Sequence, residues 1–324
     1  MKGHWVVVGC LLFGLVGCES PEFLPSEIPF PKDNPSSKEK IALGRALFFD
    51  TRLSKDGTVS CASCHRPEFA FTDRKPLAEG IGGLHAERNA PTLLNSAFLE
   101  TVMFDAHLKT LELQVIVPIQ EPTEMGHNMK ELIPKLQQIP AYQKAAKEIF
   151  NRDFDAWVLT RSIAAFERSL LSFNSPYDQY QKGDKNALSA QEVAGMKLFN
   201  SLYCGQCHPA PYFTNFKPEN NGLYAEYGKD KGRFRIHLDS ADIGFFKVPT
   251  LRNIALTYPY MHDGSMHTLE DVLRHYQEGG THPKGQNINI RPFTLSETEQ
   301  QQLIAFLHSL TDTSYMKKFR GNAR

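Results

Sequence analysis

The 324 residues carry 36 basic and 36 acidic side chains, so the formal net charge at pH 7 is zero. This balance gives no electrostatic argument for a nucleic-acid partner, because nucleic-acid-binding proteins usually carry an excess of Lys and Arg. With a short leader set aside, the remaining length is enough for two domains.

The first 18 residues have the features of an export signal. Lys2 precedes an apolar run that ends near Val16 and is too short to span a bilayer. The run closes on L-V-G-C, which resembles the lipobox of bacterial lipoproteins, so we expect Cys18 to carry a lipid anchor. An ordinary cleaved signal peptide is the alternative. Both interpretations export the chain to the periplasm, and residues 19–37, rich in Pro, Ser and Glu, are expected to form a flexible linker.

The first chemical motif along the chain is CASCH at 61–65, and CGQCH follows at 204–208. C-x-x-C-H is the attachment sequence of c-type haem, in which two thiols bond to the porphyrin and the histidine ligates the iron. The alternatives are a disulfide, a thioredoxin-type pair or a zinc site, and zinc would need the two separate motifs to come together. We therefore predict two covalent haem c groups. Their expected attachment residues are Cys61, Cys64, Cys204 and Cys207, with His65 and His208 as proximal iron ligands.

The predicted secondary structure is mainly helical, and clear alternating strands are scarce. Residues 155–173 have apolar side chains at helical spacing. Ser296 and Glu299 stand in capping-box register at the start of a later helix. Thr110 and Thr268 are expected N-caps, each followed by a glutamate that the helix dipole favours in the first turn.

The two halves of the chain share an ordered set of motifs. PTLLN at 91–95 is matched by PTLRN at 249–253, and the M-x-D and T-L-E sequences that follow keep the same offset of 158 positions without a gap. A fixed offset indicates a duplicated unit. We therefore expect two homologous cytochrome c-like haem domains from an internal duplication, at residues 38–180 and 181–324.

Position 118 is informative because Pro118 corresponds to Tyr276 at this offset. Proline has no ligand atom, so the first iron would keep an open face, whereas the Tyr276 phenolate could reach the second iron. The alternative for Tyr276 is packing, with its hydroxyl hydrogen-bonded elsewhere. We therefore expect the first haem to react with a substrate and the second haem to have protein ligands on both faces of its iron.

An open ferric haem beside a carboxylate can cleave peroxide, since a base takes a proton from the near oxygen and returns it to the departing one. Glu121 and Glu124 follow Pro118, and Gln114 lies one helical turn before it. A solvated loop position is the alternative for each carboxylate.

Residues 38–310 resemble the bacterial dihaem cytochrome c peroxidases and their sister group, the dihaem oxygenases of the MauG type. The resemblance rests on CASCH, RNAPTLLN, the spacing of Gln114 to Glu124, AAFERSL, CGQCH and VPTLRN…TYPYMHDG. It implies that Glu124 is the peroxidatic acid/base and that Gln114 is its neighbour. It also implies a calcium ion between the domains, with Asn89 and the backbone carbonyls of Thr257 and Pro259 as ligands.

Three positions bear on the branch of this family. The peroxidases commonly place Met where this chain has Tyr276, and the MauG type places Tyr there, which lowers the haem potential. Phe104 stands where both groups usually have a Trp between the haems. Electron transfer between the haems by hopping through this residue is therefore in doubt, unless Trp157 or nearby tyrosines substitute. The alternative role for Phe104 is core packing. Ile81 stands where many peroxidases have a distal histidine that must leave the first iron on reductive activation, so we expect no activation step. His85, in the same loop, is expected to face solvent.

Three histidines cluster around the second copy of the repeat. The family places His262 near the second haem, where it would bond a propionate or order the pocket. His267 and His275 are expected at the surface.

The sequence as a whole predicts an oxidoreductase that reduces hydrogen peroxide at the first haem, with electrons relayed through the second haem from a small c-type cytochrome or cupredoxin. A MauG-type oxidase that acts on a protein substrate is the main alternative. A non-catalytic electron carrier would need both irons closed, and Pro118 with Glu124 argues against it. A peroxide sensor and a homodimer are left open by the sequence.

Overall fold

The computed structural model of the protein describes residues 24–25 and 27–319. Cys18 and the rest of the expected export signal lie outside these residues, as does the start of the expected linker. Within the described part of the chain, no helix is both long enough and apolar enough to cross a bilayer. The end of the linker, which we expected to be flexible, packs against the first half of the chain. Asn34 is fully buried, and its amide donates to the Glu112 carboxylate at 2.7 Å and to the Arg161 carbonyl at 3.0 Å.

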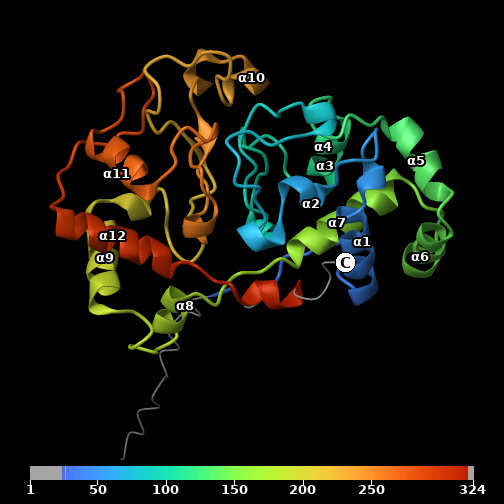
Figure 1. Ribbon diagram of the computed structural model, residues 1–324, viewed down its shortest axis with the longest axis horizontal. Helices are drawn as coiled ribbons and strands as arrows, with labels where there is room; N and C mark the ends of the chain where they lie inside the picture. The colour runs from blue at the N-terminus through green and yellow to red at the C-terminus, as the bar shows by residue number, and fades with distance from the viewer. Residues whose placement is uncertain (1–23, 26, 320–324) are drawn as a thin grey trace, which may run out of the picture.

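Helices and long loops make up the fold, as predicted (Figure 1). In the first half the helices are α1 (Lys38–Phe48), α2 (Cys61–Cys64), α3 (Leu111–Gln114), α4 (Ile116–Gln120), α5 (Met129–Gln137), α6 (Pro140–Phe150) and α7 (Ala156–Arg168). In the second half they are α8 (Pro176–Gln181), α9 (Ala190–Ser201), α10 (Phe234–His237), α11 (Leu269–Gln277) and α12 (Glu297–Ser309). The two short strands, β1 (Pro218–Glu219) and β2 (Phe246–Lys247), pair antiparallel.

Side-chain caps start the helices where the sequence predicts. The Leu113 N–H donates to the Thr110 side chain at α3, and Thr268 forms a capping box with Asp271 at α11. Ser296 and Glu299 form the predicted capping box at α12.

The helix expected over 155–173 is shorter, since α7 ends at Arg168. The reason is a tertiary contact: the side chain of Asn95 accepts from the Ser172 N–H at 2.8 Å and donates to the Ser172 carbonyl at 2.9 Å. This pair of hydrogen bonds satisfies the backbone groups of Ser172 outside a helix.

Each half has its own hydrophobic core. Buried side chains between Leu43 and Leu170 form the first core, and those between Tyr177 and Leu310 form the second. Tyr315, from the end of the chain, joins the first core rather than the second. In Figure 1 the last helical turn, η8 (Ser314–Lys318), accordingly lies back beside the first half.

In each half, two helices cross at a glycine. A Cβ on Gly44 of α1 would lie 1.8 Å from the carbonyl oxygen of Ser162 in α7. A Cβ on Gly195 of α9 would lie 1.9 Å from the carbonyl oxygen of Gln302 in α12. Both contacts are with backbone, so a side-chain rotation cannot relieve them. The two crossings therefore require glycine.

Local backbone geometry also recurs at the offset of 158 residues. Asn95 and Asn253 both have a left-handed backbone, with φ of 62° and 60°, and each starts a short 3₁₀ turn. The isolated bridge between Val102 and Leu108 has its counterpart between Tyr260 and Met266. The repeat in the sequence thus corresponds to a repeat in backbone conformation.

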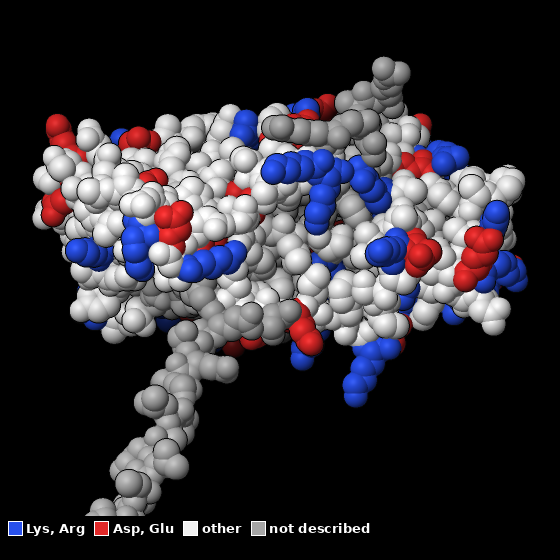
Figure 2. Space-filling model, turned by 90° about the horizontal axis from the view of Figure 1, so that it is seen from below, with Lys and Arg blue, Asp and Glu red and all other residues white. Residues whose placement is uncertain are grey.

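Charged side chains of both signs are interspersed on the face shown in Figure 2, apart from a group of basic side chains near its centre. This distribution agrees with the zero formal net charge of the chain.

The glycine at the second crossing gives a stability prediction. Gly195→Ala should lower the free energy of unfolding by about 2–3 kcal/mol, because an added methyl group overpacks a backbone contact. Gly228→Ala is the matched control, since a Cβ there would have nothing within 4 Å. Urea unfolding of the two haem-loaded variants measures the difference, and equal losses in both would contradict the role of the crossing.

Candidate functional site

His65 and His208 are held in the same way. Nδ1 of His65 lies 2.9 Å from the Phe71 carbonyl oxygen, and Nδ1 of His208 lies 3.0 Å from the Phe213 carbonyl oxygen. Because a carbonyl only accepts, Nδ1 carries the proton and Nε2 keeps its lone pair. Burial lowers the pKa of both rings, that of His208 to about 4, so both are neutral at pH 7. This is the state that a metal-ligating histidine requires.

The four motif cysteines are free thiols, so neither motif forms a disulfide in this structure. Burial raises the pKa of all four, to about 11 for Cys204 and about 12 for Cys64. Redox-active cysteines show the opposite shift, because their thiolate is stabilised. Among the residues that the structure describes, no group of three or more His, Cys, Asp or Glu side chains could hold a metal ion. The thioredoxin-type and zinc alternatives are therefore not supported.

A cavity of about 310 Å³, lined mainly by the second half and completed by residues of the first half, contains the second motif. Cys204, Cys207 and His208 form part of its wall, together with Tyr276 from the last turn of α11. Most of the other wall residues are apolar, among them Phe199, Leu202, Leu251, Ile254, Leu269, Leu273, Leu303 and Leu307. Two protonated thiols and a neutral imidazole in an apolar cavity fit a covalently attached haem.

The position of Tyr276 agrees with the predicted second ligand. It shares one cavity with His208, as two ligands of the same iron must. Burial raises the pKa of Tyr276 to about 12, while a hydrogen bond with the Asn221 side chain acts in the opposite direction. The hydroxyl thus has a protein partner as well as access to the cavity, so both sequence-based alternatives remain geometrically compatible.

Glu124 lies close to the first motif. Its negative charge contributes to the raised pKa values of Cys61 and Cys64, which places the three groups in one environment. Burial, together with repulsion from Glu121, raises the pKa of Glu124 to about 7. Glu121 instead accepts a hydrogen bond from the Thr123 hydroxyl at 3.2 Å. Of the two candidate carboxylates, Glu124 therefore has the pKa of a general acid/base at neutral pH.

The Gly-rich loop packs directly against the Glu124 turn. The Ile81 N–H donates to the Glu124 carbonyl at 2.8 Å, and the Met125 N–H donates to the Pro118 carbonyl at 3.1 Å. Ile81, at the position of the expected distal ligand, thus lies at this site with a side chain that cannot bind a metal. His85 is exposed, as predicted.

Gln114 is half-buried at the end of α3. Only Val115 separates α3 from α4, which carries Pro118, so Gln114 lies one turn before Pro118 as expected.

Asn89, Thr257 and Pro259 come together where the halves meet, and all three line the cavity. The Asn89 side-chain amide donates to the Pro259 carbonyl at 3.1 Å and to the Lys75 carbonyl at 3.1 Å. In this structure the amide nitrogen of Asn89, and not its oxygen, faces these two carbonyls, so calcium binding by Asn89, Thr257 and Pro259 stays a prediction.

Phe104 also lies at this boundary and lines the cavity. Its ring centroid is 5.8 Å from the Arg88 guanidinium, which also lies over Phe246 at 5.2 Å. Trp157 is not part of the cavity wall: it packs against Phe150 and under the Arg161 guanidinium. Trp157 therefore does not take the position of the missing inter-haem Trp, whereas three tyrosines do line the cavity, namely Tyr203, Tyr260 and Tyr276.

The three clustered histidines have different surroundings. His262 is buried, lines the cavity and stacks on Phe246 with ring centroids 3.9 Å apart, in agreement with a role in ordering the pocket. His267 is exposed as predicted. The prediction for His275 was wrong: this residue is buried, because its Nε2 is hydrogen-bonded with the Asn221 carbonyl at 3.0 Å.

Sequence reasoning missed a buried carboxylate that has an unpaired oxygen. Glu167 is 4% exposed, and its Oε2 has no hydrogen-bond partner among the described residues. Burial raises its pKa to about 8. Aligning the two crossing helices through Phe166 and Phe306 places Glu167 opposite Leu307, a residue of the cavity wall. That second offset, of 140 residues, is the signal that could have found Glu167.

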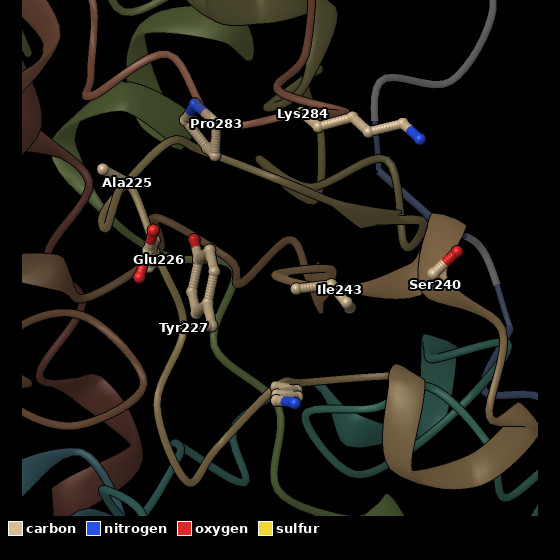
Figure 3. A pocket seen from close by; sticks show the side chains of 8 residues that line it. Ala225, Glu226, Tyr227, Ser240, Ile243, Pro283 and Lys284 are labelled. Carbon is tan, nitrogen blue, oxygen red and sulfur yellow. The ribbon is translucent and has the colours of Figure 1, made fainter.

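A surface pocket of about 300 Å³ lies elsewhere in the second half (Figure 3). Tyr227 and Glu226 lie side by side in it, and Lys284 extends away from them. It contains none of the predicted site residues.

Comparison with known proteins agrees with these features. Residues 38–186 match the family model of the di-haem cytochrome c peroxidases. The chain is 37% identical over 289 residues to the methylamine utilization protein MauG of Methylorubrum extorquens, covering 88% of this chain and 82% of MauG. It is 35% identical over 291 residues to a cytochrome c551 peroxidase of Nitrosomonas europaea, covering 87% and 83%.

Among solved structures, the chain is similar to a MauG-like protein associated with microbial copper homeostasis. The TM-score is 0.86 at 34% sequence identity, over 92% of this chain and 96% of the other. The cytochrome c-like helical fold is therefore shared with that protein.

The shared cavity of His208 and Tyr276 gives a spectroscopic prediction. In the haem-loaded protein, Tyr276→Phe should convert one low-spin ferric haem to high spin, because phenylalanine offers no ligand atom. Tyr260→Phe is the matched control, since Tyr260 lines the same cavity but donates to the Ile254 carbonyl at 3.3 Å. Ferric absorption and electron paramagnetic resonance spectra measure the change, and a Tyr276→Phe spectrum identical to wild type would assign the ligand to another residue.

Proposed function

The chain belongs to the di-haem cytochrome c peroxidase family and is an oxidoreductase, and we propose that it reduces hydrogen peroxide to water at an N-terminal haem c. Electrons reach this site from a donor protein through a C-terminal haem c. The observation that carries the proposal is Glu124, a half-buried carboxylate with a pKa of about 7 beside the first C-x-x-C-H motif.

Glu124 acts on the protons of the reaction. When bound at Cys61, Cys64 and His65, the haem would supply an iron that can bind peroxide and the electrons that reduce it. As a carboxylate, Glu124 accepts the proton of the nearer peroxide oxygen; as the acid, it delivers that proton to the departing oxygen, which leaves as water. Ile81 and Pro118 keep this place free of a protein ligand, and Gln114 orients groups from the neighbouring turn.

The second site transfers electrons instead. His208 and Tyr276 would ligate the iron from within one cavity, which leaves no position for peroxide. Each C-x-x-C-H motif would belong to one haem domain, at residues 38–180 and 181–324, and the recurring backbone geometry supports their origin by duplication.

A calcium ion between the domains is part of the proposal, held by Asn89 and the carbonyl oxygens of Thr257 and Pro259. The protein would act in the periplasm, where haem c is attached, tethered to a membrane through Cys18. The electron donor would be a small c-type cytochrome or a cupredoxin.

A second candidate function is a MauG-type oxidase that uses peroxide to oxidise a protein substrate. Tyr276 and the similarity to MauG favour it, and the copper-associated relative makes a copper-handling partner protein a candidate substrate. Phe104 argues against it, because phenylalanine is far harder to oxidise than the Trp that usually stands between the haems in this family.

The role of Glu124 is tested by substitution. Glu124→Gln should lower peroxide turnover about 100-fold or more, the usual contribution of a general acid/base, while both haems remain loaded. Turnover of the wild type should rise as the pH increases through about 7, because the carboxylate form is the base.

Glu121→Gln is the matched control. It should retain turnover and move the midpoint of the pH profile to a lower value, since repulsion from Glu121 contributes to the raised pKa of Glu124. Unchanged turnover in haem-loaded Glu124→Gln would reject the assignment.

A further inference from the structure

Lys247 is half-buried, and its side chain lines the cavity of the second motif. Its backbone is held from two sides: Lys247 pairs with Pro218 in the two-stranded sheet, and its N–H donates to the Phe104 carbonyl of the first half at 2.7 Å. The side chain therefore starts from a fixed point at the boundary between the halves.

The ammonium group of Lys247 has no ion-pair or hydrogen-bond partner among the described residues, and burial alone lowers its pKa, to about 8. Two buried arginines are neutralised by carboxylates: Arg88 pairs with Asp105 at 2.8 Å, and Arg168 pairs with Glu112 at 2.6 Å. A charge in a poorly solvated place is unfavourable without such a partner. The cavity thus presents a cation whose partner the described chain does not supply.

Two other charged residues line the cavity wall, and neither is paired with Lys247. Glu219 accepts from the Asn287 side chain at 2.7 Å, and Arg291 is exposed and donates to the Ile288 carbonyl. A ligand that fits has a flat apolar body for the wall and a carboxylate for Lys247. Haem has both, since its two propionates are its only anionic groups.

We infer that Lys247 binds a propionate of the C-terminal haem and raises the reduction potential of that haem. This inference rests on the proposed haem at Cys204, Cys207 and His208. A fixed positive charge near the iron favours the reduced state, which carries one more electron.

The repeat shows that this cation is specific to the second site. At the offset of 158 residues, Lys247 corresponds to Asn89 in the first copy, whose side chain is a neutral amide. The second site is also the one with Tyr276, whose phenolate would lower the potential and hinder entry of electrons. Lys247 would offset part of that effect, so that a donor cytochrome can still reduce this haem.

The test is a redox titration of the haem-loaded protein, followed by absorption. At a fixed ambient potential near the wild-type midpoint, Lys247→Met should lower the ratio of reduced to oxidised C-terminal haem about tenfold, and Lys247→Arg should keep it within about twofold. Lys217→Met is the matched control, because Lys217 is exposed and its carbonyl accepts from the Val248 N–H next to Lys247 at 2.9 Å. An unchanged ratio in Lys247→Met, or an equal fall in Lys217→Met, would overturn the inference.

Two further readouts cover the other outcomes. In the ferric spectrum of Lys247→Met, the C-terminal haem should keep its low-spin signal. If that signal is lost, Lys247 is an iron ligand, and the inference is contradicted. If Lys247→Met does not retain haem, the haem content of Lys247→Arg and Lys247→Gln is compared. Haem in Lys247→Arg but not in Lys247→Gln supports the contact of Lys247 with a propionate, and equal haem content in the two variants rejects it. An unchanged ratio together with full peroxide turnover would reject this inference alone, whereas wild-type protein without turnover would reject the proposed function.

Discussion

The contact of a glycine with a backbone carbonyl sets the geometry on which both haem sites depend. In the second half, Gly195 lets α9 lie against α12 at the carbonyl of Gln302. Helix α9 leads into the C-x-x-C-H motif, and α12 supplies Leu303 and Leu307 to the cavity wall. The crossing therefore fixes the distance between the second C-x-x-C-H motif and the opposite wall of the cavity. Gly44 makes the corresponding crossing of α1 and α7 in the first half.

On this common frame, a few substitutions give the two sites different chemistry. Pro118 stands where the second half has Tyr276, and Glu167 stands where it has Leu307. The first site thus gains carboxylates with pKa values near neutrality, Glu124 and Glu167, and lacks a second ligand. The second site gains a tyrosine and a cation in an apolar cavity, which suits electron transfer rather than reaction with peroxide.

Features encoded in a few adjacent residues could be predicted from the sequence. The C-x-x-C-H motifs and the caps at Thr110, Thr268 and Ser296 are of this kind. Features that depend on tertiary contacts could not: Asn34 and His275 are buried because partners distant in sequence satisfy their polar groups. Lys247 and Glu167 escaped notice because only the folded structure shows that the Lys247 ammonium lines a cavity without a partner and that one buried oxygen of Glu167 has no hydrogen bond.

The proposed function is that of a peroxidase whose first site reacts without prior reductive activation. It is tested most directly by adding hydrogen peroxide and a reduced small c-type cytochrome to the fully haem-loaded protein that has never been reduced. We predict immediate, continuous oxidation of the cytochrome without a lag. A cytochrome that stays reduced while peroxide leaves a long-lived change in the spectrum of the protein would contradict it and favour oxidation of a protein substrate.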